Sequence, residues 1–205
     1  MRISLPRRPG RPGARRGRSR LTPAALVAAL AFAVFAALGS TPAQAADPTR
    51  YELVNVRTGL RADVMWASTA AYTGVFLWPD NTSASQEYEL LDSGGGYFRI
   101  KARHSGQCLM LDWRAGYANG TSVIQYPYCA AGYAGSEWTT AWVGHTCYCF
   151  PTTMILKNRA TGRCLDAEGP SGTPGQQARL QQWDCITTDE AWNTANQSWI
   201  LPAVG

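Results

Sequence analysis

The sequence predicts an all-β fold built from three copies of one unit, with pseudo-threefold symmetry. Three short alternating patterns, typical of half-buried strands, each end in Ser or Thr followed by a glycine, and these glycines are 47 and 56 positions apart. Gly, Pro, Asn, Asp and Ser recur every few residues without a strong helical periodicity, as many short strands with tight turns require. Glycine tolerates the positive φ of such turns. The three turn glycines are Gly59, Gly106 and Gly162.

Each copy also ends on an aromatic residue. We interpret these aromatic residues as core residues that meet around the pseudo-threefold axis. The three repeats then span about residues 51–91, 97–143 and 154–201. The closing motifs are Gln86-Glu87-Tyr88, Ser136-Glu137-Trp138 and Gln197-Ser198-Trp199.

Residues 1–45 have the pattern of a secretory signal peptide and are excluded from the predicted fold. Residues 1–20 contain eight arginines and no acid, and residues 21–38 form an apolar run. That run is almost long enough to span a membrane, so a membrane anchor is the alternative. A small-x-small cleavage site directly after the run favours removal and a secreted protein, with membrane contact only before cleavage. The route of export stays open between the general and the twin-arginine pathways. The cleavage site is Ala43-Gln44-Ala45.

Removal of the leader reverses the sign of the net charge. The whole chain has 19 Lys+Arg and 14 Asp+Glu, a formal net charge of +5, but eight of the basic residues lie in residues 1–20. The mature chain, residues 46–205, therefore has 11 basic and 14 acidic groups and a net charge of −3. No basic stripe remains to bind a nucleic-acid backbone, so we expect no nucleic-acid partner. The mature length suits one domain, expected to be a monomer.

All 6 cysteines lie in the mature part of the chain. An even number of cysteines behind a signal peptide indicates disulfides formed in an oxidising compartment. Cys108 and Cys129 are 21 positions apart, and Cys164 and Cys185 have the same separation at equivalent places in the next copy. This equality favours two disulfides within repeats over the other pairings that a sequence permits.

The other cysteine positions differ between the copies. Cys147 and Cys149 lie between the second and third copies. We expect a local disulfide between them, ahead of a redox or metal site. In the first copy the positions that match the disulfide are Arg61 and Asp80, so no bridge is expected there.

Polar and aromatic groups that suit a neutral sugar gather between Cys164 and Trp199. A carboxylate accepts hydrogen bonds from two neighbouring hydroxyls, and an amide both donates and accepts. An indole offers a flat apolar face to the C–H side of a pyranose ring. The groups concerned are Asp166, Gln181, Trp183, Asn196 and Gln197.

The motifs Cys-Leu-Asp, Gln-x-Trp-x-Cys and Asn-Gln-x-Trp in this stretch resemble one repeat of the ricin B-chain-type lectins, which are β-trefoils of three QxW repeats. The resemblance covers nearly all of the mature chain. It implies a β-trefoil at residues 46–205 that binds carbohydrate without catalysis. Galactose is the best-known ligand type, but xylan and other polymers also occur among similar modules, so other neutral sugars or polysaccharides stay open. It also assigns Asp166 and Asn196 to sugar hydroxyls and Trp183 to stacking. Gln181 and Gln197 would bind the sugar or hold these groups.

The first copy matches this pattern in part. Asp63 matches the acid, Trp78 the stacking residue and Gln86 the closing amide. Phe76 and Ser85 replace the remaining amides, so we expect a weak or altered second site.

The second copy is expected to serve the fold only. Met110 takes the acid position, Pro127 the stacking position and Gly135-Ser136 the Asn-Gln position. A shifted site remains the alternative here, because Asp112, Tyr126 and Tyr128 are close by.

Two other functions compete with a lectin. One is a β-trefoil that binds or inhibits a protein and keeps a vestigial sugar site, because a fold does not determine function. The other is a secreted glycan-active hydrolase, which would need a catalytic acid pair, a Ser/His/Asp set or a metal. The sequence predicts no catalytic residues, no cofactor and no metal, and calcium-independent binding, because Asp166 lacks the clustered oxygen ligands of a calcium site.

Overall fold

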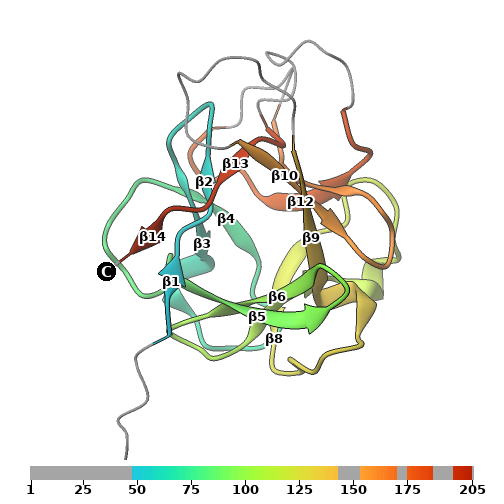
Figure 1. The fold of residues 1–205 in the computed structure, drawn as a ribbon. Helices are drawn as coiled ribbons and strands as arrows, with labels where there is room; N and C mark the ends of the chain where they lie inside the picture. The colour runs from blue at the N-terminus through green and yellow to red at the C-terminus, as the bar shows by residue number, and fades with distance from the viewer. Residues whose placement is uncertain (1–47, 143–152, 170–174, 187–195, 205) are drawn as a thin grey trace, which may run out of the picture. The chain divides into compact units, whose positions relative to one another are not determined.

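The computed structural model describes residues 48–142, 153–169, 175–186 and 196–204, all within one compact unit, Asp47–Gly205. The expected signal peptide and Cys147 and Cys149 lie outside these residues. The described chain is all-β, as predicted, with strands joined by turns and short 3-10 helices (Figure 1). In this part of the chain, no helix has the length and apolarity needed to cross a membrane.

The strands fall into three sets of four that follow the three repeats, with one more short strand near each end. The first repeat contains β2 (Val54–Asn55), β3 (Arg61–Val64), η3 (Met65–Ala67), β4 (Val75–Trp78) and β5 (Tyr88–Gly94). The second contains β6 (Tyr97–Ala102), β7 (Cys108–Leu111), η4 (Trp113–Ala115), β8 (Val123–Tyr126), η5 (Ala134–Ser136) and β9 (Glu137–Trp142). The third contains β10 (Met154–Asn158), β11 (Cys164–Ala167), β12 (Leu180–Trp183) and β13 (Trp199–Ile200). The end strands are β1 (Arg50–Tyr51) and β14 (Ala203–Val204).

The first and last strands of the repeats close into a barrel. β5 pairs with β6, β6 with β9, β9 with β10, β10 with β13, and β13 returns to β2. β1 leads into β2 after two residues and pairs with β5, which closes the ring. It also pairs with β14, so the two ends of the domain lie side by side (Figure 1). Closure pairs the strands around the ring and leaves few free edges.

The middle strands of each repeat form a hairpin outside this ring. The hairpins are β3–β4, β7–β8 and β11–β12, all antiparallel. Each is attached by one equivalent pair to the first strand of its repeat, for example Lys101 with Cys108 and Lys157 with Cys164. A barrel with three attached hairpins in pseudo-threefold arrangement is a β-trefoil, as the sequence resemblance implied.

The turn glycines and the closing aromatic residues repeat with the same geometry. Gly59, Gly106 and Gly162 have φ of 70°, 69° and 69°, which only glycine adopts freely. The three aromatic residues are fully buried in one core cluster, as predicted. Each donates a hydrogen bond to the equivalent carbonyl of its own repeat: Tyr88 Oη to Ala62 O, Trp138 Nε1 to Leu109 O and Trp199 Nε1 to Leu165 O.

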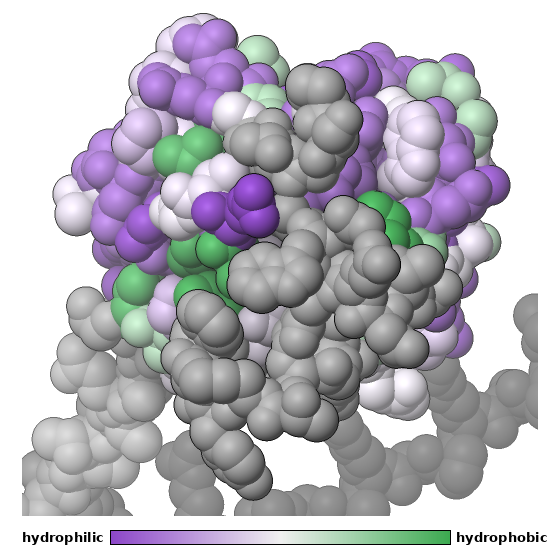
Figure 2. All heavy atoms as spheres, turned by 90° about the horizontal axis from the view of Figure 1, so that it is seen from above, coloured by the Kyte–Doolittle hydropathy of each residue, from purple (hydrophilic) through white to green (hydrophobic). Residues whose placement is uncertain are grey.

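Two disulfides join the start of a hairpin to the segment that follows it. They are Cys108–Cys129 and Cys164–Cys185, the pairs expected from their equal spacing. On the face shown in Figure 2 the visible part of the described surface is mostly hydrophilic, with hydrophobic areas among the polar ones.

Candidate functional site

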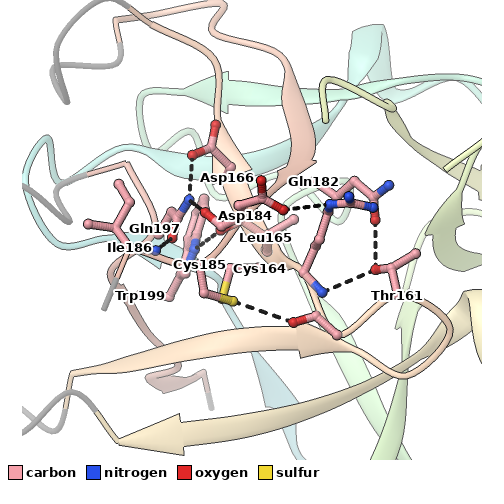
Figure 3. The surroundings of a disulfide bond; sticks show 12 residues. Thr161, Cys164, Leu165, Asp166, Gln182, Asp184, Cys185, Ile186, Gln197 and Trp199 are labelled. Atoms are coloured by element: carbon pink, nitrogen blue, oxygen red, sulfur yellow. Dashed lines mark hydrogen bonds and ion pairs between the residues drawn. A yellow bond between two sulfur atoms is a disulfide. The ribbon is translucent and has the colours of Figure 1, made fainter. Parts of the chain in front are cut away.

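The hairpin β11–β12 places the acid of the third repeat at the centre of a group of amides. Asp166 lies directly opposite Gln181 in the antiparallel register and is 2% exposed. Its Oδ1 accepts a hydrogen bond from Gln181 Nε2 at 2.9 Å. Its Oδ2 accepts bonds from Asn196 Nδ2 at 2.7 Å and Gln197 Nε2 at 3.0 Å. Three amides from two separate segments therefore fix the position of one carboxylate, and Figure 3 shows the bond from Gln197.

Burial raises the pKa of Asp166 above its usual value of 3.8, although the hydrogen bonds from Gln181 and Gln197 act in the opposite direction. The nearby Glu168 carboxylate raises this pKa further. Removal from water disfavours the charged form more than these two amides favour it. A ligand hydroxyl that donates to the carboxylate would supply the hydrogen bonding that burial removes.

The two closing amides differ in the bonds they make. Gln197 uses its whole side chain within the protein, because Nε2 also donates to Asp184 O and Oε1 accepts from Ile186 N. It therefore holds Asp166 and the residues on both sides of Cys185 together (Figure 3). Asn196 Oδ1, by contrast, is buried and accepts no hydrogen bond from the described residues. An acceptor left in this way is costly unless a ligand or water satisfies it.

Trp183 provides an accessible aromatic surface beside these groups. It ends β12 and is 43% exposed, whereas the preceding residues of that strand are buried. Its neighbour Asp184 receives hydrogen bonds from Arg163 Nε at 2.8 Å and Asn119 Nδ2 at 2.8 Å, which lower the pKa of Asp184. Asn119 belongs to the second repeat, so a loop of that repeat is hydrogen-bonded next to the stacking residue of the third repeat.

The structure brings together part of the predicted set in the first repeat. Asp63 lies opposite Phe76 in the β3–β4 register, and Gln86 Nε2 donates to Asp63 Oδ2 at 2.9 Å. Gln86 also donates to Pro79 O and accepts from Asn81 N, the same three bonds that Gln197 makes in the third repeat. Ser85 bonds to the Ser83 hydroxyl instead of the acid. Among the described residues Asp63 thus has one amide partner where Asp166 has three.

The second repeat requires a correction. The β7–β8 register pairs Cys108 with Tyr126, as β11–β12 pairs Cys164 with Trp183, so Tyr126 and not Pro127 occupies the stacking position. Tyr126 does not present an open face, because the rings of Tyr72 and Trp113 each lie with their centroid 4.9 Å from its own. Met110 at the acid position is buried and offers no charge.

Residues 38–126 match the sequence model of the family described as ricin-type beta-trefoil lectin domain-like. This part of the chain is therefore similar to the ricin-type β-trefoil lectin-like domains. The match covers the first repeat and much of the second, and the third repeat adds the intact set of polar residues described above. A search of curated protein sequences finds no match.

Solved structures agree with this fold. A designed 3-fold symmetric protein, ThreeFoil, is 29% identical with a TM-score of 0.61, over 74% of this chain and 96% of that one. An exo-beta-1,3-galactanase from Clostridium thermocellum is 30% identical with a TM-score of 0.63, over 78% of this chain but only 31% of the enzyme. A ricin B-like lectin from Macrolepiota procera, solved in complex with lactose, covers 77% of this chain and 97% of its own. Its identity is 17% and its TM-score 0.57, so it supports the fold alone.

One feature of this β-trefoil was not predicted from the sequence. A residue from the preceding repeat lies beside each stacking position, always with a left-handed backbone: Tyr72 at φ 67°, Gly120 at φ 85° and Gln177 at φ 67°. Their backbone N–H groups donate to equivalent strand carbonyls, those of Gln125, Gln182 and Leu77.

The type of residue at this left-handed position differs from one repeat to the next. Tyr72 covers Tyr126, whereas Gly120 has no side chain to lie on Trp183. A Cβ on Gly120 would stand 3.9 Å from Trp183 Cζ3 and 3.8 Å from Gln181 Oε1. Only the pairing between repeats brings Gly120 to Trp183, which is why the motif of one repeat did not reveal it.

Proposed function

We propose that the domain is a secreted, non-catalytic carbohydrate-binding module whose main site is the third repeat. The observation that carries this proposal is the buried Asp166 carboxylate, held by three amides beside the 43% exposed Trp183. The two disulfides and the leader sequence support secretion, because disulfides persist in oxidising compartments.

The geometry suits one sugar ring. Two neighbouring hydroxyls would donate to Asp166, whose three amide donors hold it in place. A further hydroxyl would donate to Asn196 Oδ1, which has no hydrogen-bond donor among the described residues. The C–H face of the ring would then lie on Trp183, where Gly120 leaves space.

Galactose-type sugars, or polysaccharides that contain them, are the proposed ligands. The resemblance to ricin-type lectins favours galactose. Two of the structural neighbours are an exo-beta-1,3-galactanase and a ricin B-like lectin in complex with lactose. A single shallow site typically binds with a Kd on the order of 1 mM, about −4 kcal/mol. A repeating polymer would raise the effective affinity if the first repeat also bound.

The test is to titrate galactose and a galactan into the mature chain, residues 46–205, by NMR or calorimetry. Removing the carboxylate in Asp166→Ala should cost about 1.5–3 kcal/mol and take monosaccharide binding out of the measurable range. Trp183→Ala should act similarly by removing the stacking surface. Asp63→Ala and Trp78→Ala should leave galactose binding nearly intact and weaken retention on the polymer.

Asp112→Ala is the matched control, because it removes a carboxylate from the second repeat that pairs with Arg114 at 2.7 Å. This variant should bind galactose and the galactan as tightly as the parent. Full binding by folded Asp166→Ala and Trp183→Ala would refute the site. Equal losses of galactose binding in Asp63→Ala and Asp166→Ala would refute the ranking of the two repeats. A lack of binding to any glycan would favour a protein-binding trefoil.

A further inference from the structure

The first repeat presents an aromatic cluster that the third repeat lacks at its described positions. Trp66, Phe76 and Trp78 are in mutual contact, with ring centroids 5.4–6.4 Å apart. Phe76 lies opposite Asp63 in the β3–β4 register, so the cluster stands beside the buried carboxylate. At the position of Trp66, three residues after the acid, the third repeat has Gly169.

Trp66 is held in an exposed position by an unusual backbone. It is 73% exposed, and its φ of 60° and ψ of 25° are left-handed, as is the φ of 50° at Ala67. Residues with side chains rarely adopt this conformation, and such outliers concentrate at ligand-binding sites. Folding alone would favour burial of an indole of this size.

The second repeat shows how the same position looks when it serves packing. Trp113 stands three residues after Met110, as Trp66 does after Asp63. Its ring packs against Tyr126 and Tyr72, and the Arg114 guanidinium lies 3.8 Å from the Tyr72 ring centroid. In the second repeat the aromatic rings therefore cover one another. In the first repeat the residue equivalent to Tyr72 is Gln177, which brings no aromatic ring.

The polar groups of the first site are correspondingly reduced. Phe76 stands where Gln181 donates in the third repeat, and the Ser85 hydroxyl is bonded to Ser83. Asp63 accepts a bond from Gln86 at Oδ2, and none is recorded to Oδ1 from the described residues. A ligand here meets one carboxylate and a large aromatic surface, whereas the third site offers a carboxylate, amides and one indole.

We propose that the first repeat binds a sugar carrying an apolar substituent, with a hydroxyl on Asp63, the ring on Trp78 and the substituent on Trp66. The substituent is an aryl group at the anomeric carbon or a deoxy methyl group on the ring. Both present C–H surface next to a hydroxyl, the combination that Asp63 and the cluster offer. This inference rests on the proposed carbohydrate binding and gives the two repeats different ligand preferences.

The test uses three probes, methyl β-galactoside, phenyl β-galactoside and 6-deoxygalactose, titrated into the mature chain. Indole N–H signals in ¹⁵N-labelled protein report on the two sites separately, after assignment of Trp66, Trp78 and Trp183 by single Trp→Phe variants. At the first site phenyl β-galactoside should bind about two- to tenfold more tightly than methyl β-galactoside, the range expected for an added aromatic pair. The third site should show no such preference.

Trp66→Ala should abolish the preference at Trp78 and leave the Trp183 titration unchanged. Because Trp66 is exposed, this variant should fold. Trp113→Ala is the matched control and should keep the preference, since that ring already packs on Tyr126 and Tyr72. A stronger response to 6-deoxygalactose than to phenyl β-galactoside would place the substituent on the ring instead of at the anomeric carbon.

Two results distinguish failure of this inference from failure of the proposed function. If Trp183 responds to all three probes and Trp78 shows no preference for either substituted sugar, the carbohydrate-binding function stands and the inference is wrong. A preference that persists in Trp66→Ala would also overturn it. If neither Trp183 nor Trp78 responds to any probe, the galactose-type function itself is wrong.

Discussion

Arg61 and Asp80 form an ion pair at the positions where the other two repeats have a disulfide. Arg61 Nη2 lies 3.1 Å from Asp80 Oδ2, and Arg61 pairs with Trp78 across β3–β4 as Cys164 pairs with Trp183 across β11–β12. The pair therefore connects the same two segments without a covalent bond. Because both side chains are partly exposed, its contribution should be no more than about 1 kcal/mol.

The double variant R61C/D80C should form a third hairpin disulfide. The existing bridges have Cα–Cα distances of 5.3 and 5.1 Å, and the pseudo-symmetry places residues 61 and 80 equivalently. Closing a loop of this size should add about 3 kcal/mol to the free energy of unfolding, less what Arg61 contributes through its ion pairs with Asp80 and with Glu52, the latter at 3.2 Å. Mass spectrometry after alkylation would detect the bond, and thermal unfolding would measure the gain.

The single variants R61C and D80C are the controls, because each removes the ion pair without allowing the new bridge. Both should be slightly less stable than the parent. A double variant whose two new thiols react with alkylating agent in the folded state would contradict the equivalence of the three hairpins.

The fold was predictable because its signals lie within single repeats. Turn glycines such as Gly106, closing aromatic residues such as Trp138 and the two equally spaced cysteine pairs are local patterns that recur. The structure bears out the all-β trefoil they predicted. The buried position of Asp166 among its amides also agrees with the motif of one repeat.

Other features depend on compensation or on contacts between repeats. The disulfides of the second and third repeats have equal sequence separations. However, Tyr126 lies one position nearer to Cys108 than Trp183 does to Cys164. This difference is compensated by one more residue before Cys129, so counting from the cysteine selected Pro127. The position of Gly120 beside Trp183 arises from pairing between repeats, which no spacing within one repeat reports.

Gly120 should control access to the third site. In Gly120→Tyr the new side chain would start 3.9 Å from the Trp183 ring and lie on it, as Tyr72 lies on Tyr126. We expect monosaccharide binding to fall more than tenfold, because the stacking surface is covered. The left-handed backbone at φ 85° should also cost about 1–2 kcal/mol of stability. Sugar titration and thermal unfolding would measure the two effects.

Gly96→Tyr serves as the control for backbone strain. Gly96 has φ 80° and nothing within 4 Å of an added Cβ, and it lies in the turn between β5 and β6. It should lose similar stability and keep full sugar binding. Unchanged binding in Gly120→Tyr would show that the loop of the second repeat does not limit the third site.

Asp166 should make sugar binding depend on pH. Its folded pKa is raised above 3.8, mainly by burial, so the carboxylate becomes protonated at a higher pH than an ordinary aspartate. Hydroxyl donors prefer the ionised form, and binding should therefore decline as the pH falls through the interval just above 3.8. The sign for stability is the reverse. The native state takes up a proton that the unfolded chain has not yet bound, so this group favours folding at low pH and its contribution is lost as the pH rises.

Calorimetric titration of sugar between about pH 3 and pH 7 would test the binding part of this prediction. Asp166→Asn, whose side chain does not titrate in this range, should bind weakly at every pH. Chemical unfolding of the parent and of Asp166→Asn should show that the difference in their stability changes across the pH interval just above 3.8. Sugar affinity that stays constant as the pH falls past the raised pKa would exclude Asp166 as the hydroxyl acceptor.

Tyr88 should contribute to stability through its hydroxyl as well as its ring. The side chain is fully buried, and Oη lies 3.0 Å from Ala62 O and 3.2 Å from Ser85 O. Burial raises the pKa of Tyr88 well above 10.0, which keeps the hydroxyl protonated as a donor. Tyr88→Phe retains the ring but removes the hydroxyl that donates to Ala62 O, whereas Ser85 O keeps its bond from Val64 N, so unfolding should become easier by about 1–3 kcal/mol. Tyr128→Phe, at a side chain that is 54% exposed, should stay within about 0.5 kcal/mol of the parent in the same denaturant experiment. If the two variants proved equally stable, the hydrogen bond from Tyr88 to Ala62 would not contribute to holding the β3–β4 hairpin on the core.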